Sequence, residues 1–483
     1  MKWKDVDYKP YTSTERYSSD EEALRQEDFI QKAQILVREY AEKTGRVPSA
    51  CVVTFGCQMN ARDSEKLCGI LSRTGFMLTE DEEADLVVYN TCSVRDNANQ
   101  RVYGRLGHLH AMKDKNPSKK IALCGCMVQE AAVIDKIKRS YSFVDLIFGT
   151  HNIYKFPELL VMMLSSDKMV VDVWDKTEAI VEDLPVERKF SFKSGVNIMF
   201  GCDKFCTYCI VPYVRGRERS REPKDIIREV EKLAADGVSE VMLLGQNVDS
   251  YGKGLSGDVT FPGLLKEVEK VDGIRRIRFM TSHPRDLSDE LIELMAVSDK
   301  ICKHLHLPVQ SGSSRVLKAM NRGYTREAYL DLVSRLKASV PDLALTTDII
   351  VGFPGETFED IDETISLVKE VEYDNAFTFI YSPRSGTPAA EMPRSMSDDE
   401  IKTGFDRLLK CVQDTAKKRV ARYAGGVYEA LTEGLNDHDD TMVTGRLSNN
   451  LLVHYKADSS FIGKYVNVKL LENKGFYYIG EMI

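Results

Sequence analysis

The sequence lacks the segments that would place a chain across a membrane or send it out of the cell. Among its 483 residues, no stretch approaches the roughly 18 uninterrupted apolar residues that a membrane-spanning helix needs. Its first ten residues, MKWKDVDYKP, are charged where a secretory signal would be apolar. Low-complexity tracts and long internal repeats are missing too. We therefore expect a cytoplasmic protein without a membrane partner.

The chain has no large excess of positive charge either. Its 66 Lys and Arg face 74 Asp and Glu, a net charge of −8. This argues against non-specific nucleic-acid binding by the whole surface but allows a local basic patch. With 43% hydrophobic residues, the chain is long enough for two or three domains, each with its own core. Its eleven cysteines come without an export signal, so metal binding or reduced thiols are favoured over disulfides.

Short apolar runs alternate with amphipathic segments from Ala50 onward. The runs ACVVTF, DLVVYNT, KKIALCG and FVDLIFG are each followed by a polar segment of helical spacing. This alternation predicts βα units on a doubly wound parallel sheet, which we assign to residues 48–165. Residues 1–47 are interpreted as an N-terminal extension with one helix, and 166–190 as a linker with room for one strand.

Three cysteines of this domain each follow a predicted strand. They are Cys57, Cys92 and Cys126, separated by about one βα repeat each. Ligands of parallel sheets collect at the carboxyl ends of the strands, so one crevice could hold all three thiols.

A second βα series predicts a partial barrel of six units over residues 191–417. Its candidate strands are VNIMF, EVMLLGQN, RIRFMTS, KHLHLPVQ, ALTTDIIVGF and NAFTFIYSP. In such barrels the chemistry lies at the C-terminal strand ends. After Gly425 the apolar period becomes two, and five short strands predict a small all-β barrel, resembling the oligonucleotide-binding type, over residues 418–483.

The stretch GCDKFCTYC places Cys202, Cys206 and Cys209 directly after the first strand of the partial barrel. A structural zinc site is normally closed by four protein ligands, whereas a reactive site keeps one position open. Three thiolates without a fourth nearby therefore favour a 4Fe–4S cluster with one iron lacking a protein ligand. The alternative is a zinc knuckle that a distant cysteine or histidine completes.

These residues carry a resemblance. GCDKFCTYC after a strand, in a chain of six βα units, resembles the radical S-adenosylmethionine (SAM) superfamily, in which the open iron chelates SAM and an electron cleaves it to a 5′-deoxyadenosyl radical. The contexts FGCQMN, NTCSVR and CGCMVQ resemble the N-terminal domain of the methylthiotransferases, where such cysteines bind an auxiliary 4Fe–4S cluster that donates sulfur. The C-terminal strands resemble a TRAM domain. The likeness covers nearly the whole chain from residue 50, and YCIVPYVRGRERSR is similar to the tRNA-acting members of the MiaB type.

The resemblance implies a function and its cofactors. The enzyme would convert N6-isopentenyladenosine at position 37 of tRNA into its 2-methylthio derivative, with two 4Fe–4S clusters and SAM carrying the chemistry in place of catalytic side chains. Its partners would be the tRNA anticodon stem-loop and an electron donor such as a flavodoxin or ferredoxin, with the enzyme a monomer. Alternatives are a methylthiotransferase for threonylcarbamoyladenosine or for a ribosomal-protein aspartate, or a non-catalytic RNA-binding iron–sulfur protein.

The family pattern places the third auxiliary ligand after a glycine, which favours Cys126 over Cys124.

Further site residues are predicted from the resemblance and from their places at strand ends. For SAM they are Tyr208, Gly245, Gln246, Asn247, Ser282, Gln310, Arg322 and Asp348. The GQN sequence stands where the superfamily usually has a GGE-type motif. For RNA they are Arg215, Arg217, Arg219 and Arg221, which alternate in VRGRERSR, and Arg446, Asn449, Asn450 and Tyr455 of the small barrel. The arginine run could also be a solvated basic face, and the last four residues could be turn or strand-surface positions.

Overall fold

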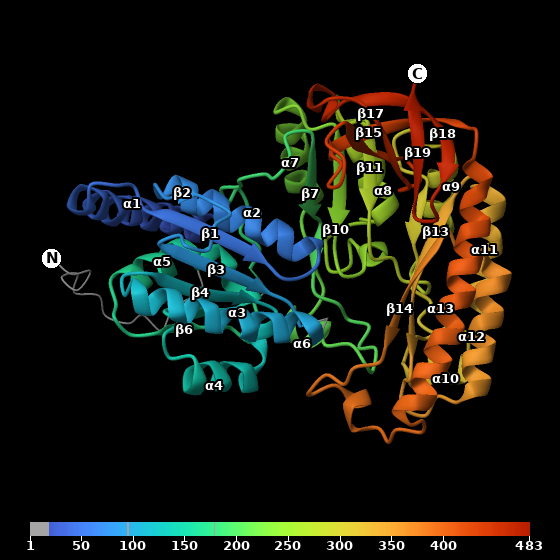
Figure 1. Ribbon diagram of the computed structural model, residues 1–483, viewed down its shortest axis with the longest axis horizontal. Helices are drawn as coiled ribbons and strands as arrows, with labels where there is room; N and C mark the ends of the chain where they lie inside the picture. Colours follow the sequence, from blue (N-terminus) through green and yellow to red (C-terminus); the bar gives the residue numbers. More distant parts are fainter. Residues whose placement is uncertain (1–18, 94–95, 178) are drawn as a thin grey trace. The chain divides into compact units, whose positions relative to one another are not determined.

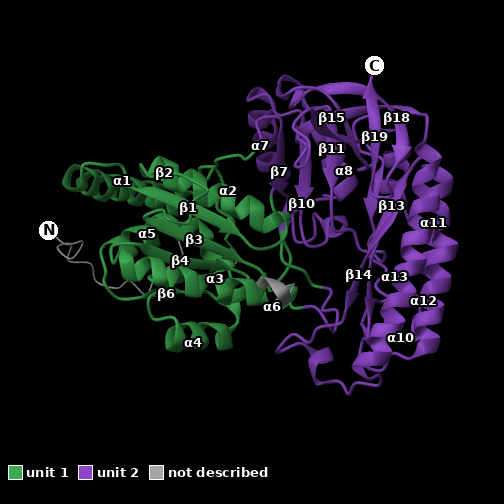
Figure 2. Ribbon diagram, viewed as in Figure 1, with its two compact units in different colours: residues 1–189, 200–203, 210–221 green, residues 190–199, 204–209, 222–483 purple. Residues whose placement is uncertain are grey.

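The computed structural model describes residues 19–93, 96–177 and 179–483, and the chain divides into two compact units (Figures 1 and 2). The first unit runs to Lys189 and includes residues 200–203 and 210–221. The second unit comprises residues 190–199, 204–209 and 222–483. Within the described residues, no helix is both long and apolar enough to span a membrane.

Unit 1 is built on a six-stranded parallel sheet of order β2-β1-β3-β4-β5-β6. Each of the four apolar runs of this region forms one of its strands, and the predicted doubly wound fold is confirmed. The sixth strand comes from the stretch interpreted as a linker, because its apolar residues pair with β5. The strands are β1 (Ser49–Thr54), β2 (Met77–Leu78), β3 (Leu86–Thr91), β4 (Lys120–Gly125), β5 (Leu146–Phe148) and β6 (Val170–Asp172).

Helices cover both faces of this sheet because alternate strand residues point to opposite sides. Leu86 and Val88 pack with α1 (Ser19–Thr44), α2 (Gln58–Arg73) and α5 (Phe156–Leu164). Val87 and Tyr89 pack with α3 (Asp96–Lys115) and α4 (Ala131–Ser140). The helix α1, expected in the N-terminal extension, therefore contributes to the core of unit 1.

Unit 2 contains the predicted partial βα barrel, and its six strands are confirmed. One half has the order β11-β10-β7 and the other β12-β13-β14, and a parallel bridge between Ile277 and Ile301 connects them. The first strand begins and ends earlier than expected, and Met199–Phe200 form a separate short strand, β8. The barrel strands are β7 (Lys193–Asn197), β10 (Glu240–Leu244), β11 (Arg276–Phe279), β12 (His304–His306), β13 (Ala344–Val351) and β14 (Asn375–Ile380).

Amphipathic helices cover the outside of this barrel (Figure 1). They are α7 (Pro223–Ala235), α8 (Phe261–Glu269), α9 (Asp289–Val297), α10 (Ser314–Ala319), α11 (Arg326–Ser339), α12 (Phe358–Val371) and α13 (Asp398–Val420).

The chain ends in a closed barrel of order β15-β16-β17-β19-β18, as the period of two predicted. Its interior holds a small apolar core in which Tyr455 and Tyr478 are fully buried. The strands are β15 (Val427–Leu435), β16 (Met442–Leu447), β17 (Leu452–Lys456), β18 (Tyr465–Asn473) and β19 (Tyr477–Met482).

Candidate functional site

The cysteines of unit 1 meet at the carboxyl edge of its sheet. Cys57 directly precedes α2, Cys92 follows β3 and Cys126 follows β4. The backbone N–H of Cys126 donates to the Thr91 carbonyl at 2.9 Å, which fixes the end of β4 beside that of β3. A Cβ on Gly56 would lie 2.9 Å from the Cβ of Cys92, so the absence of a side chain there lets the first loop approach the second.

An arginine and two polar residues of α2 connect two of these thiols, Cys57 and Cys126. Asn60 and Asp63 follow Cys57 at intervals of three, on one side of the helix. The guanidinium of Arg215 contacts three atoms: Nε lies 3.2 Å from Cys126 Sγ, Nη1 2.9 Å from Asp63 Oδ2, and Nη2 3.2 Å from Asn60 Oδ1. The same Asn60 oxygen lies 3.3 Å from Cys57 Sγ. The sequence analysis missed both α2 residues, although their spacing from Cys57 signals a shared face.

Burial and a fixed cation act in opposite directions on the thiol of Cys126. Burial raises the pKa of the Cys126 thiol to about 11, and the adjacent Arg215 cation opposes that rise. Burial alone would lower the pKa of Arg215, but Cys126 and Asp63 outweigh it and hold the guanidinium charged. A buried cation with thiol and carboxylate partners suits thiolates bound to iron.

The residues present fit an iron–sulfur cluster better than a single ion. In the described part of the chain, no three His, Cys, Asp or Glu side chains lie close enough to hold one metal ion. The thiolates of a cluster bind different irons and lie farther apart. Cys124 packs into the apolar core with Ala122 and Phe148, and burial raises its thiol pKa well above the usual value. Its place favours Cys126 as the third ligand.

The second cysteine motif is divided between the units. Cys202 belongs to unit 1, where its N–H donates to the Gly216 carbonyl at 3.2 Å. Gly201 has a φ of +77°, and a Cβ there would lie 2.1 Å from the Arg217 carbonyl oxygen, so only glycine fits. Cys206 and Cys209 belong to unit 2.

Residues 204–209 are fixed to the end of α10 within unit 2. The N–H of Thr207 donates to the Met320 carbonyl at 3.1 Å, and its hydroxyl donates to the Ala319 carbonyl at 2.9 Å. The Asn321 amide donates to the Phe205 carbonyl at 3.0 Å, which supports the left-handed φ of +47° at Phe205. The loop carrying two of the three thiols is thus held by backbone and side-chain bonds.

Two predicted SAM residues lie against Cys206. The buried Arg322 places Nη1 3.4 Å from Cys206 Sγ and 3.5 Å from the Tyr208 hydroxyl. Its Nη2 donates to the Pro308 carbonyl at 2.8 Å, and its Nε to the Tyr324 hydroxyl at 3.1 Å. Burial raises the pKa of Tyr208, whereas Arg322 opposes the rise. Arg322 therefore offers a fixed positive charge beside the thiol.

The remaining predicted SAM residues follow β10, β11 and β12, or lie within β13 in the case of Asp348. Gln310 is buried with a φ of +72°, and its N–H donates to the Asp348 carbonyl at 2.9 Å. Gly245, the half-buried Gln246 and Asn247 follow β10. The side-chain amide of Asn247 donates to Asp286 at 2.6 Å. The Asn247 side-chain oxygen is buried and has no hydrogen-bond partner among the described residues. An acceptor left open at a strand end suits a ligand that carries an N–H or O–H donor.

Asp249 is a further, partly buried acid of this region that the sequence analysis missed. It accepts hydrogen bonds from the Ser282 hydroxyl at 3.1 Å and the His283 N–H at 2.9 Å. Burial raises the pKa of its carboxyl to about 7. Its position two residues after the GQN sequence was the available signal.

The alternating arginines do not form one basic face. Arg215 and Arg221 are buried, the second beside Glu182. Arg219 is partly buried and donates to the Thr177 carbonyl at 2.8 Å, whereas the exposed Arg217 pairs with Asp203 at 2.7 Å. For Arg215 and Arg221 the prediction of RNA contact is wrong, because both guanidinium groups are buried in unit 1. Arg215 pairs there with Asp63, and Arg221 with Glu182.

The predicted RNA residues of the small barrel also differ in exposure. Tyr455 is 0% exposed in the barrel core, with its hydroxyl 2.6 Å from that of Thr432, so an RNA contact there is excluded. Arg446 pairs with Glu433 at 3.0 Å. Asn449 and Asn450 form the turn between β16 and β17.

Comparisons with known proteins place the chain in a family. Residues 196–368 match the model of the radical SAM superfamily, and residues 49–149 match uncharacterized protein family UPF0004. The tRNA-2-methylthio-N(6)-dimethylallyladenosine synthase of Lachnoclostridium phytofermentans is 57% identical over 447 residues, 92% of this chain and 98% of that protein. The chain belongs to this synthase family. The member from Acetivibrio thermocellus is 50% identical over 97% of this chain and 98% of its own length.

A solved structure agrees with the radical SAM fold of this synthase family. The radical SAM methyltransferase TsrM from Kitasatospora setae, determined with cobalamin and a 4Fe–4S cluster bound, matches with a TM-score of 0.52. The match covers 71% of this chain and 74% of that one at 15% identity, so it concerns the fold alone. The resemblance to radical SAM methylthiotransferases seen in the sequence is confirmed.

Proposed function

We propose that this protein converts N6-isopentenyladenosine at position 37 of tRNA into 2-methylthio-N6-isopentenyladenosine. The observation that carries this proposal is the 57% identity, over 98% of its length, to a synthase named for this modification. The contact of Arg215 with Cys126, and of Asn60 with both Arg215 and Cys57, supports it, because a second set of iron ligands separates methylthiotransferases from simpler radical SAM enzymes.

Two 4Fe–4S clusters and SAM are the cofactors of this proposal. Cys57, Cys92 and Cys126 would hold the auxiliary cluster, and Cys202, Cys206 and Cys209 the cluster that binds SAM. When bound, these groups supply the sulfur, the methyl group and the radical that removes hydrogen from C2 of the adenine.

The side chains of this chain bind, orient and fix charge around those groups. Arg215 places a cation on Cys126, and Arg322 places one beside Cys206. The open oxygen of Asn247 would accept a hydrogen bond from the SAM amino group, with Ser282 and Gln310 beyond neighbouring strands and Asp348 within β13. Tyr208 would border the adenine of SAM, with Gly245 and Gln246 beside it.

The finer assignments complete the proposal. Residues 48–165 would form the auxiliary-cluster domain, 191–417 the radical SAM domain and 418–483 a TRAM domain that contacts the anticodon stem-loop. A flavodoxin or ferredoxin would supply electrons to a monomeric enzyme in the cytoplasm. Arg217, Arg219, Arg446 and Asn450 keep enough exposure to contact RNA, whereas Asn449 is buried.

The test is mass spectrometry of tRNA nucleosides from cells that lack this protein. The 2-methylthio-isopentenyl nucleoside should disappear, its isopentenyl precursor should accumulate, and the intact gene should restore the product. A Cys57→Ala variant should fail to restore it. Loss of a methylthiolated threonylcarbamoyl nucleoside, or of a methylthiolated aspartate in a ribosomal protein, would instead assign one of the alternative substrates.

A further inference from the structure

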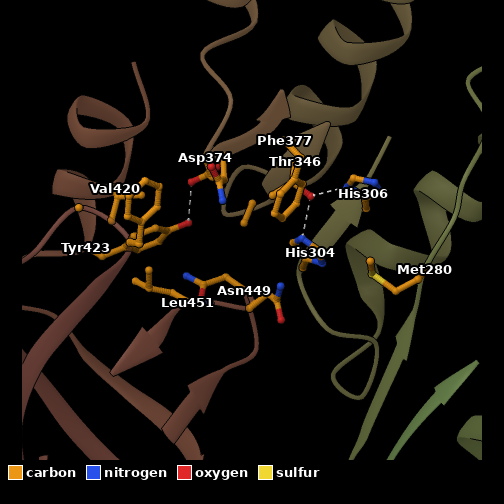
Figure 3. A pocket seen from close by; sticks show the side chains of 15 residues that line it. Met280, His304, His306, Thr346, Asp374, Phe377, Val420, Tyr423, Asn449 and Leu451 are labelled. Carbon is orange, nitrogen blue, oxygen red and sulfur yellow. Dashed lines mark hydrogen bonds between the residues drawn. The ribbon is translucent and has the colours of Figure 1, made fainter. Parts of the chain in front are cut away.

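Unit 2 contains a cavity of about 130 Å³ that the proposed cofactors do not use (Figure 3). One wall is the inner face of β12, β13 and β14, including His304, His306 and Thr346. The opposite wall comes from two hairpin turns of the small barrel, which contribute Asn449, Asn450 and Phe476. The C-terminal barrel and the partial barrel thus build this cavity together.

The size and walls of the cavity suit one flat ring. An apolar cavity of about 150 Å³ in another protein holds a single benzene. Phe377 and Phe476 border this one, yet they remain 48% and 63% exposed, which is unusual for aromatic side chains beside a cavity. The rings of His306 and Phe377 meet edge to face with centroids 6.0 Å apart. These surfaces offer stacking area to a ligand.

Polar groups of the cavity are held in place by the protein itself. The Thr346 hydroxyl lies 3.0 Å from His304 Nε2 and 3.0 Å from His306 Nδ1, as drawn in Figure 3. Since one hydroxyl donates only one proton, it can donate to one ring while the other ring donates to it. The Asn449 side chain hydrogen-bonds to the Leu451 N–H and to Tyr423, and the Asn450 oxygen accepts from Arg446, so the Asn450 amide group is the donor that this turn offers.

The cavity lies next to the candidate SAM residues. Thr346 precedes Asp348 by two residues on β13, a rise of about 7 Å along a strand. His306 connects the two places, with Nε2 3.5 Å from Asp348 Oδ2. Asp348 lies three residues before the end of β13, so a ligand beside Thr346 would lie about 17 Å from the carboxyl end of that strand, farther than one nucleotide reaches.

We propose that this cavity binds one unstacked pyrimidine base of the RNA substrate, in the same loop as the reacting adenosine. The inference rests on the proposed function, which supplies an RNA, and goes beyond it by naming a second base-binding site. Single-stranded RNA is recognised through unstacked bases that stack on aromatic side chains and hydrogen-bond through their edges. A one-ring base fits the volume better than a purine. An isopentenyl group would leave the polar wall without partners.

The experiment is a thermodynamic cycle between the protein and the RNA. The probe is an anticodon stem-loop RNA that carries isopentenyladenosine, in which each loop pyrimidine is replaced in turn by an abasic nucleotide. Affinity is measured for the wild type, for Phe476→Ala, which opens one wall, and for Ala344→Leu, which fills the cavity. Leu471→Ala, 53% exposed on the same small barrel and outside the cavity, is the matched control.

One abasic replacement should weaken binding to the wild type and to Leu471→Ala roughly tenfold. The same replacement should have no further effect on Phe476→Ala or Ala344→Leu, which already lack the site. All four proteins should form 5′-deoxyadenosine from SAM at equal rates without RNA, which shows that they are folded and loaded.

Two results would overturn the inference while leaving the proposed function intact. In one, every abasic replacement has equal effects on wild type and cavity variants although the wild type methylthiolates the RNA. In the other, the loss in Phe476→Ala depends on the isopentenyl group and not on any pyrimidine. A wild type that methylthiolates no isopentenyl stem-loop would overturn the proposed function as well.

Discussion

Arg215 shows how much one buried charge contributes at the scale of the residue. Its guanidinium touches Cys126, Asp63 and Asn60, and its side chain is 6% exposed. Arg215→Met would leave the carboxylate of Asp63 buried without its partner, which costs about 3–5 kcal/mol. We expect the free energy of unfolding of the cluster-free protein to fall by that amount in urea titrations, and the iron content after reconstitution to fall too.

A matched control lies two residues further along. Arg217 makes its ion pair with Asp203 while its side chain is 74% exposed, so Arg217→Met should change stability by less than about 1 kcal/mol. Adding Asp63→Asn to Arg215→Met should restore part of the loss, because it removes the unpaired charge. Equal losses from the two arginine variants would contradict the role assigned to Arg215.

Asp249 makes stability depend on pH in an uncommon direction. Burial raises its pKa to about 7, above the value near 3.9 of an unfolded aspartate. Between these values the folded state binds more protons than the unfolded state, so the contribution of Asp249 to stability falls as pH rises from about 4 to 7. The Asp249→Asn variant has no carboxyl group at this position, so its stability lacks this decrease with pH. The unfolding free energy of the wild type minus that of the variant should therefore decrease from pH 5 to pH 8.

Asp286 supplies the comparison with opposite sign. Burial raises its pKa, but the hydrogen bonds from Lys204 and Asn247 outweigh this and lower it below the usual value. Its contribution is present above about pH 4 and is lost only at more acid pH. The stability difference caused by Asp286→Asn should therefore stay constant from pH 5 to pH 8. A pH-independent effect of Asp249→Asn would mean that its carboxyl is charged throughout.

At the scale of the element, α1 tests whether the N-terminal extension belongs to the core of unit 1. Phe29, 6% exposed, packs into the core that α5 shares, and Arg25 pairs with Glu158 of α5 at 2.7 Å. Phe29→Ala should lower the free energy of unfolding by about 3–5 kcal/mol in denaturant titrations. Leu24→Ala on the same helix, at a side chain 74% exposed, should change it by less than about 0.5 kcal/mol. Similar effects of both would place α1 outside the core.

Elements were predictable where the signal is local. Apolar runs located the strands of both units, and the cysteines after β1, β3 and β4 could be expected at one sheet edge, because parallel strands align their ends. Partner choice is not local. Nothing near VRGRERSR shows that Arg215 would meet Asp63, or Arg221 meet Glu182, so a run of charge that looks exposed in sequence is largely buried in the fold. The same holds for α1, whose polar composition conceals its packing face.

At the scale of the whole molecule, the two cysteine triads are expected to load independently. Arg215 and α2 support Cys126 and Cys57 within unit 1, whereas α10 and Arg322 support Cys206 within unit 2. In the described part of the chain, only Cys202 is held by the residue next to Arg215, through the Gly216 carbonyl, so most supports of one triad do not depend on the other. The fully reconstituted protein should hold about eight irons, and each triple Cys→Ala variant about four.

SAM cleavage separates the two triads by role. The variant lacking Cys57, Cys92 and Cys126 should still form 5′-deoxyadenosine under reducing conditions, because the thiols that leave an open iron for SAM remain. The variant lacking Cys202, Cys206 and Cys209 should keep its iron absorbance but form none. If either variant lost all its iron, the six thiols would hold one shared centre, and the assignment of separate roles to the triads would be wrong.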